Sequence, residues 1–324
     1  FQNPRFRIPV IVMAISDLIN ANFTARELEA KAVITNHRLC ETNLFDDEHL
    51  IRILDTHPRH NLNVHTMGTD EATLDWREGD ASKLSGEQLL AATRQGRLWL
   101  NIRNMILHHR EYANLINGMY DEIEAKVPYF KAVERSANLL VSSPAAIVYY
   151  HLDIPCNMLW HLRGIKRVWA YPPHDERFVS QVMLEDVICG DKYEEIPYDP
   201  SFDEHALVHD LKPGEMITWP QNAPHRVSNL EGLNVSLTTE HLTPQAQRKI
   251  KLYRANRFFR QRFGCQQLST DIHGIACATK LASYKLVRAW QKLFPAKVED
   301  YEYPKTFELD PTSPAEVREL AARS

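Results

Sequence analysis

The chain has 324 residues, of which 44% are hydrophobic and 25% charged, and its formal net charge is −4 at pH 7. This is the composition of an ordinary globular protein that can bury a sizeable core. No apolar run reaches the roughly 18 residues that a membrane-spanning helix needs, so we expect no membrane insertion. The acidic balance also argues against nucleic acid as the main partner.

Five cysteines, at positions 40, 156, 189, 265 and 277, show no spacing typical of a zinc or redox site. We therefore expect free thiols in a reducing compartment, with the cytoplasm as the location. The chain begins with Phe1 rather than Met and shows no signal-peptide pattern. On that ground we also expect that an N-terminal segment is missing.

Residues 1–140 predict α/β elements packed on a central β domain. Ser85 begins a helix with a capping-box pattern, and residues 96–102 predict a strand. Residues 105–126 predict one amphipathic helix that stops before Pro128.

Residues 141–243 alternate short apolar strands with Pro and Gly turns, which is typical of a double-stranded β-helix of the jelly-roll type. The expected fold class is therefore mainly β with added α. Residues 174–209 are acidic and weakly periodic, so we expect this insert to cover the mouth of the β domain as a substrate lid.

Residues 244–324 predict a C-terminal helical region with further helices over 277–294 and from Ser313 onward. Residues 244–263 contain seven basic residues and no acids. One interpretation is a face for nucleic acid or an acidic partner. The other is a helix that packs by its apolar stripe while its cations stay in solvent, and the net charge favours this second interpretation.

Three triplets place an acid two residues after a histidine, at 109–111, 151–153 and 174–176. About two are expected by chance in this composition. Residues 145–153 predict a strand, where His151 and Asp153 share one face and can converge on one ion. The first triplet lies in a predicted helix, where side chains two positions apart diverge, and His174 follows two prolines.

His225 completes a ligand set with His151 and Asp153, because two imidazoles and one carboxylate are typical of non-haem Fe(II) sites with open positions. From His151 the pattern is H-x-D-x3-N-x6-G, through Asn157 and Gly164. From Gly214 it is G-x5-P-x-N-x2-H-x3-N, centred on His225. The clustered histidines at 57, 60 and 65 lack a nearby Cys or acid at ligand spacing and are interpreted as loop residues rather than a metal site.

These two patterns resemble the cupin motifs, and the run H-L-D-x3-N-x6-G-x-K-R-x4-P-P is similar to the JmjC-type, cupin-like 2-oxoglutarate oxygenases. Within that family the similarity is greatest to the group of the asparaginyl hydroxylase of hypoxia-inducible factor. The resemblance covers residues 145–241. It implies that His151, Asp153 and His225 are the catalytic Fe(II) ligands, with 2-oxoglutarate as co-substrate.

The same resemblance implies a co-substrate site. Lys166 stands where the family pairs a lysine with the distal carboxylate of 2-oxoglutarate, Asn157 matches a residue that lines the site, and Thr238 lies near another pocket position. The chain departs from the family at Val148, where a hydroxyl residue is usual, and at Glu240, where an amide is usual. Asn222 replaces the usual glycine of the second cupin motif, and Asn is the residue that best tolerates a glycine-like φ.

The cation for the distal carboxylate has three candidates, Lys166, Arg163 and Arg167. If a turn forms at residues 163 and 164, Lys166 opens the next strand, and strand parity then points it inward. A buried cation there would offset the desolvation of the far carboxylate. Arginine would offer a bidentate fork instead.

The sequence thus predicts an Fe(II)- and 2-oxoglutarate-dependent hydroxylase that oxidises an unactivated C–H bond of a protein side chain or small molecule. The resemblance also implies a homodimer formed through the C-terminal helices. One alternative is a metal-dependent cupin isomerase or dioxygenase without 2-oxoglutarate. Another is a catalytically silent cupin-like binding protein, with nucleic acid as the weaker choice of partner.

Overall fold

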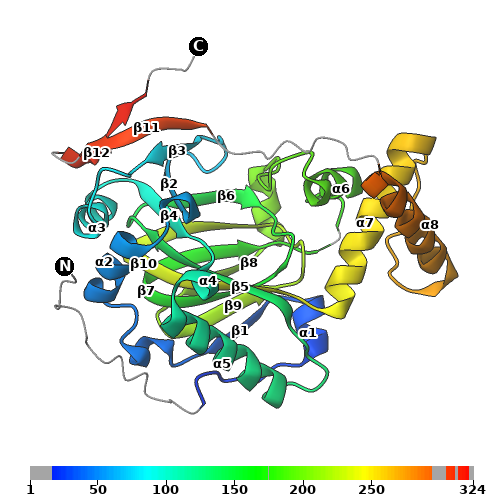
Figure 1. Ribbon diagram of the computed structural model, residues 1–324, viewed down its shortest axis with the longest axis horizontal. Helices are drawn as coiled ribbons and strands as arrows, with labels where there is room; N and C mark the ends of the chain where they lie inside the picture. Colours follow the sequence, from blue (N-terminus) through cyan, green and yellow to red (C-terminus); the bar gives the residue numbers. More distant parts are fainter. Residues whose placement is uncertain (1–16, 174, 294–303, 311–312, 321–324) are drawn as a thin grey trace.

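The structure is a computed structural model that describes residues 17–173, 175–293, 304–310 and 313–320. Its centre is a large β-sheet (Figure 1). The sheet is twelve-stranded, in the order β1-β9-β7-β10-β5-β4-β2-β3-β11-β12, with β6 added to β10 and β8 to β7. The strands are β1 (Val33–Asn36), β2 (Leu62–Met67), β3 (Trp76–Asp80), β4 (Leu98–Ile102), β5 (Val133–Ser142), β6 (Ile147–His151), β7 (Cys156–Ala170), β8 (Leu207–Leu211), β9 (Glu215–Trp219), β10 (His225–Leu242), β11 (Lys305–Asp310) and β12 (Ser313–Glu319).

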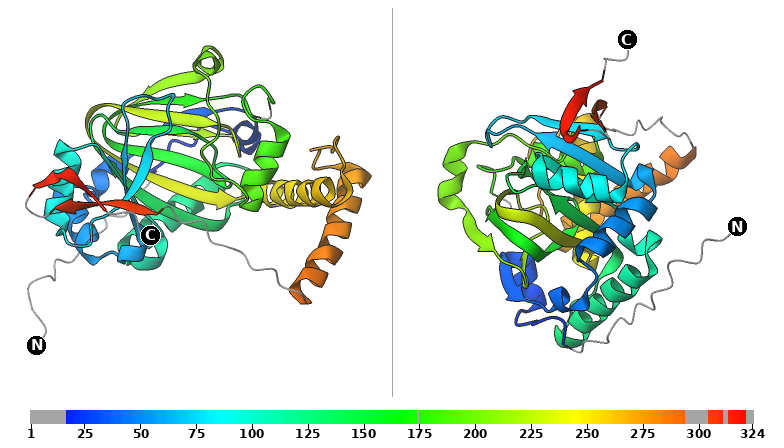
Figure 2. Two further views of the ribbon diagram at one scale, coloured as in Figure 1. Left: turned by 90° about the horizontal axis from the view of Figure 1, so that it is seen from above. Right: turned by 90° about the vertical axis from the view of Figure 1, so that its left-hand side faces the viewer.

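Helices cover the sheet and extend from one end of it (Figures 1 and 2). The α-helices are α1 (Ala25–Ala30), α2 (Asp47–Thr56), α3 (Gly86–Gln95), α4 (Met105–His108), α5 (Arg110–Lys126), α6 (Gln181–Cys189), α7 (Pro244–Phe263) and α8 (Gly274–Leu293). Three 3-10 helices are η1 (Leu39–Thr42), η2 (Arg59–Asn61) and η3 (Pro200–His205). No helix among the described residues is long and apolar enough to cross a membrane.

The two longest strands, β7 and β10, run antiparallel and organise the β domain. The first half of β7 and the second half of β10 form a four-stranded set with the flanking strands β5 and β9, in the order β5-β10-β7-β9. The second half of β7 and the first half of β10 form another four-stranded set with β6 and β8, in the order β6-β10-β7-β8. Two four-stranded sets that share a pair of strands in this way are the double-stranded β-helix predicted from the sequence.

The chain does not reverse at residues 163 and 164: β7 continues through them, and most of the extra residues opposite belong to β10. The register between β7 and β10 shifts between Asn229 and Val235, opposite this point. Gly164 has φ +80°, and a Cβ there would lie 2.7 Å from Nδ2 of Asn234. Glycine is therefore required by both backbone and packing, and the bend carries Lys166 into the second set without a chain reversal.

The N-terminal elements confirm two sequence predictions and change a third. Ser85 caps α3 through a full capping box, and the strand predicted at 96–102 is β4. The single helix predicted over 105–126 is two helices, α4 and α5. His109 leaves the helical region at φ −131°, and its ring stacks on that of His57 with a centroid separation of 5.2 Å.

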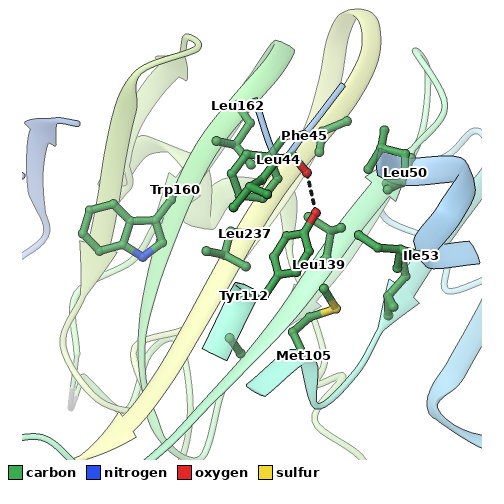
Figure 3. Close-up of a cluster of buried hydrophobic side chains, with 14 of the residues drawn as sticks. Leu44, Phe45, Leu50, Ile53, Met105, Tyr112, Leu139, Trp160, Leu162 and Leu237 are labelled. Atoms are coloured by element: carbon green, nitrogen blue, oxygen red, sulfur yellow. Dashed lines mark hydrogen bonds between the residues drawn. The ribbon is translucent and has the colours of Figure 1, made fainter. Parts of the chain in front are cut away.

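The main core lies between the sheet and the helices α2 and α5 (Figure 3). Tyr112 of α5 is fully buried among Leu139 of β5, Leu237 of β10 and Ile53 of α2. Its hydroxyl donates to the carbonyl of Leu44. A buried phenol needs such an acceptor, so this bond fixes α5 against the segment before α2.

The basic helix α7 packs within the protein, as the second interpretation predicted, but not all its cations are in solvent. Arg260 pairs with the buried Glu185 of α6 at 2.8 Å, and Arg257 pairs with Asp186 of α6 at 3.0 Å. The predicted second helix is α8. All five cysteines are free.

The helix predicted from Ser313 is wrong, because this segment is strand β12 of a hairpin with β11. β11 pairs in parallel with the edge strand β3, far from α8 in the fold (Figures 1 and 2). Phe307 is fully buried there. β11 pairs with the open sheet edge, and β12 pairs with β11, so backbone pairing outweighs the local capping pattern at Ser313.

Candidate functional site

The three predicted metal ligands meet inside the β domain. His151 ends β6, Asp153 follows it, and His225 begins β10 directly opposite His151 in the register. Nε2 of His151 is 3.8 Å from Oδ1 of Asp153, and Nε2 of His225 is 3.5 Å from Oδ2 of the same carboxylate. Among the described residues they are the one group of three or more His, Cys, Asp or Glu side chains with ligand atoms within 4.8 Å of one another.

The backbone sets the tautomer of both histidines. Nδ1 of His151 is 2.7 Å from the carbonyl of Tyr149, and Nδ1 of His225 is 3.2 Å from the carbonyl of Ala223. A carbonyl can only accept, so each Nδ1 carries the proton and each Nε2 presents a lone pair toward Asp153. Burial also holds the pKa of His225 well below its usual value. These donors fit a divalent metal of the Fe(II) type.

Asp153 is held by two asparagines. Nδ2 of Asn157 on β7 donates to its Oδ2 at 2.9 Å, and Nδ2 of Asn222 donates to its backbone carbonyl at 2.8 Å. Asn222 has φ +64°, which confirms the glycine-like conformation predicted there. Burial raises the pKa of Asp153, so an ion of opposite charge would relieve a real desolvation penalty.

Thr238 of β10 lies against Asn157 rather than standing alone. Its hydroxyl donates to Oδ1 of Asn157 at 2.7 Å. Both side chains line the cavity that contains the three candidate ligands. Asn157 therefore contacts the candidate ligand Asp153 directly, whereas Thr238 contacts only Asn157.

Of the three candidate cations, Lys166 alone lines the cavity. Lys166 is 4% exposed and lines the cavity, whereas Arg163 and Arg167 do not. Arg163 pairs with Asp47 at 2.7 Å, and Arg167 pairs with Asp210 at 2.6 Å. Burial lowers the pKa of Lys166 to about 7, so its ammonium form would gain from an anion in the cavity.

The cavity is large, about 1340 Å³, and reaches from Lys166 past the candidate metal ligands to β2, β3 and β11. The segment expected as a lid contributes to it. The amide of Leu152 donates to the carbonyl of Glu194 at 3.1 Å, and the amide of Ile196 donates to the carbonyl of Tyr150 at 3.2 Å. These bonds fix the insert along the free edge of β6, so it is a packed wall that places Glu194 and Glu195 at the cavity.

Sequence reasoning missed Trp219 and Glu194. The Trp219 ring lies over the His225 ring with a centroid separation of 4.0 Å. Burial and the neighbouring carboxylate of Asp153 raise the pKa of Glu194 to about 8 and that of Glu240 to about 7. Trp219 precedes the predicted motif residue Pro220 on an alternating strand, which is a signal for its position, whereas Glu194 lies in a segment without periodicity.

Among the described residues, the competing histidines form no second group of three or more candidate metal ligands. His109 contacts His57, whereas Glu111 pairs with Arg52 at 2.8 Å, so the first triplet diverges as predicted. His174 lies outside the described residues. His65, expected in a loop, is buried in β2 between Trp76 and Trp99, because alternating strand residues carry it to the face that those two rings cover.

One family model matches the middle of this chain. Residues 92–239 match the family model described as the cupin-like domain. The matched stretch, a little under half of the chain, includes His151, Asp153 and His225, as well as Lys166, Asn157 and Thr238. A search of curated proteins finds no significant match.

Among solved structures, the chain is similar to YcfD of Escherichia coli. One such structure has 14% sequence identity and a TM-score of 0.48, with 85% of this chain and 70% of that chain covered. Another, described as a ribosomal oxygenase in complex with cobalt and 2-oxoglutarate, has 15% identity and a TM-score of 0.42. That alignment covers 82% of this chain and 63% of that chain, so this chain spans less than two thirds of its length.

Proposed function

We propose that the protein is an Fe(II)- and 2-oxoglutarate-dependent oxygenase that hydroxylates an unactivated C–H bond. The observation that carries the proposal is the convergence of His151, Asp153 and His225 in one cavity with the buried Lys166. Bound Fe(II) would supply oxygen activation: one oxygen atom of O2 enters the substrate as hydroxyl, and the other enters succinate as 2-oxoglutarate loses CO2. The cupin-like domain supports the same assignment.

In this proposal the three ligands occupy one face of the ion and leave its other positions for 2-oxoglutarate and oxygen. The backbone carbonyls behind His151 and His225 keep both imidazoles neutral and oriented. Asn157 holds the carboxylate of Asp153 toward them. Rigid support of this kind fixes the ion without a rearrangement at each turnover.

Lys166 binds the distal carboxylate of 2-oxoglutarate. It is the cation that the described cavity lining offers on β7, and both neighbouring arginines already pair with other acids. The 1-carboxylate and 2-oxo group would then face the metal. A buried charge pair satisfies both partners, since each is desolvated in the cavity.

The test is spectroscopic and needs no known substrate. Fe(II) and 2-oxoglutarate, mixed with the protein without oxygen, should give a weak visible charge-transfer band. Asp153→Ala should abolish the band together with metal retention measured by elemental analysis. Metal binding without any 2-oxoglutarate binding would instead indicate the cupin isomerase or dioxygenase. Absence of metal binding would indicate the silent binding protein.

Location and assembly are part of the proposal. Five free cysteines fit a reducing compartment such as the cytoplasm.

The helices α7 and α8 expose large apolar side chains, with Phe263 65%, Ile275 83% and Leu286 75% exposed, and these would pack in a homodimer. Light scattering on the intact protein should give twice the chain mass, and Ile275→Lys with Leu286→Lys should give the single mass.

A further inference from the structure

The turn between β9 and β10 contacts two of the three candidate metal ligands. The side chain of Trp219, at the end of β9, hydrogen-bonds to the carboxylate of Asp153, and its ring lies over that of His225. Nδ2 of Asn222 donates to the backbone carbonyl of Asp153 at 2.8 Å. The carbonyl of Ala223 lies 3.2 Å from Nδ1 of His225. The orientation of both ligands therefore depends on where this turn lies.

The turn itself is strained at Asn222. This residue has φ +64°, in the left-handed region that few residues other than glycine adopt. Its Oδ1 is buried and has no hydrogen-bond partner among the described residues. Strain of this kind persists only where the surrounding structure fixes the backbone. The turn therefore needs support from other elements.

Two hydrogen bonds at Gln221 supply such support. Its Nε2 donates to the carbonyl of Ile154 at 3.0 Å, which ties the turn to the segment that carries the candidate ligand Asp153. Its own carbonyl accepts from Nζ of Lys249 on α7 at 3.0 Å. The helix α7 lies beyond the stretch that matches the family model. The C-terminal region thus contacts the turn from outside that stretch.

A lysine is an unusual residue at position 249. Its side chain is half-buried, and burial lowers the pKa of the ammonium to about 8. Its helix neighbours Ala246, Ile250 and Tyr253 are buried. Lysine is seldom placed in such surroundings, because desolvation of its charge costs free energy. The hydrogen bond to Gln221 is a contact that an apolar residue at this position could not make.

The helix α7 is fixed independently of the turn. Arg260 pairs with Glu185 at 2.8 Å, and Arg257 pairs with Asp186 at 3.0 Å, so two ion pairs connect α7 to α6. Lys249 therefore reaches the turn from a helix whose position is set elsewhere.

We propose that Lys249 is a positioning residue for the candidate metal site: from α7 it holds the β9–β10 turn and, through that turn, Asp153 and His225. This inference rests on the proposed oxygenase function, because the function needs a metal at these ligands. Lys249 does not line the cavity that contains them, so it acts through the backbone of Gln221. Its loss should weaken metal binding without removing a ligand.

A second cavity makes a direct test possible. It measures about 550 Å³, and Lys249, Gln221 and Trp219 are among its lining residues. In Lys249→Ala, an alkylammonium ion from solution can enter the space that the side chain leaves and donate to the same carbonyl. n-Propylammonium has the length of the deleted atoms and keeps the N–H donors, whereas tetramethylammonium has the charge without any N–H.

The experiment compares Lys249→Ala and Lys249→Met with wild type and with Lys251→Ala. Methionine fills most of the space of the lysine but has no donor. Lys251 is the matched control, because it is exposed on the same helix. Competition with a chelator measures Mn(II) affinity. Amide exchange at Ala223, whose N–H donates to the carbonyl of Pro220 at 2.9 Å, reports on the turn, and the melting temperature without metal reports on folding.

Both Lys249 variants should bind Mn(II) about tenfold more weakly, as for loss of outer support to a ligand. Ala223 should exchange faster in both, while the metal-free melting temperature stays close to that of wild type. n-Propylammonium should restore affinity in Lys249→Ala but not in Lys249→Met, whose side chain fills the space. Tetramethylammonium should restore neither, and Lys251→Ala should behave as wild type.

Wild-type affinity and exchange in both Lys249 variants overturn the inference. Rescue by tetramethylammonium also overturns it, because the effect would then come from charge alone. Unfolding of both variants without metal overturns it as well, since Lys249 would then support the fold in general. Failure of wild type to bind Mn(II) refutes the proposed function instead, and exchange at Ala223 still tests whether Lys249 holds the turn.

Discussion

At the scale of single residues, Asn157 connects the candidate metal ligand Asp153 to the barrel wall. Removal of its side chain in Asn157→Ala leaves Oδ2 of Asp153 without its 2.9 Å donor. We expect metal affinity to fall about 10- to 100-fold, the usual effect of losing an outer hydrogen bond to a ligand. Competition between the protein and a chelator for Mn(II) measures it.

Thr238→Val is the matched control for this prediction. It removes the hydroxyl that donates to Oδ1 of Asn157 but leaves the bond between Asn157 and Asp153 intact. Metal affinity should change by no more than about threefold, because neither ligand atom is affected directly. An equal loss in both variants would show that Asn157 supports the cavity in general rather than Asp153 in particular.

Lys166 should make 2-oxoglutarate binding depend on pH. Burial lowers its pKa to about 7, whereas a dianion beside the ammonium would raise it. Above pH 7 the free protein therefore carries a neutral amine, and binding must take up a proton. The dissociation constant should rise with pH, by up to about tenfold per unit above pH 7. Calorimetry at pH 8 in buffers of different ionisation enthalpy should detect the proton uptake.

Lys166→Arg separates charge from titration. An arginine remains charged over this pH range, so its 2-oxoglutarate binding should be weaker overall but nearly flat with pH from 7 to 9. Lys166→Met should weaken binding at every pH. A wild-type pH slope that persists in Lys166→Arg would assign the proton to another group of the cavity.

At the scale of elements, Gly164 lies at the bend between the two halves of β7, opposite the irregular segment of β10. Gly164→Ala places a Cβ in a left-handed conformation and 2.7 Å from Nδ2 of Asn234. Gly190→Ala has almost the same φ, +79°, but a Cβ there meets nothing within 4 Å. We expect about 1 kcal/mol of destabilisation at Gly190 and about 2–4 kcal/mol at Gly164. Urea unfolding measures both, and equal values would mean that packing against Asn234 contributes nothing.

Local patterns predicted the elements whose partners lie nearby in the sequence. Ser85 carries its helix signal within four residues. The strand predicted over 145–153 is shorter, β6 ending at His151, but Asp153 follows so closely that both side chains still reach one point. The helix predicted at Ser313 failed because this segment pairs with β11, which itself lies on the edge strand β3 more than 200 residues earlier. The break at His109 likewise depends on the ring of His57, which no local pattern reveals.

At the scale of the whole molecule, the candidate site draws on segments far apart in the chain. The placement of His151, Asp153, His225 and Lys166 in one cavity was predictable, because spacing within two motifs reports on neighbouring strands. The cavity walls formed by β11 and by the insert before β8 were not predictable, since they require knowledge that β3 pairs with β11 and that the insert follows the edge of β6. Long-range pairing of this kind leaves no periodic signal in either segment.

Metal and 2-oxoglutarate should stabilise the fold in a fixed order. A ligand that binds only the folded state adds about 2.7 kcal/mol at a concentration 100 times its dissociation constant, which corresponds to a rise of several degrees in melting temperature. Mn(II) should give this rise in wild type, because the ligands come from β6 and β10 and converge only when both strands are paired.

The effect of 2-oxoglutarate should depend on the metal. Two of its oxygens face the ion in the proposed site, so alone it should raise the melting temperature little, and after Mn(II) it should add a second increment. Lys166→Met should keep the Mn(II) increment and lose the second one, whereas Asp153→Ala should lose both. The opposite order, with a full 2-oxoglutarate increment in Asp153→Ala, would mean that the co-substrate is held by the barrel alone and that the metal site has another use.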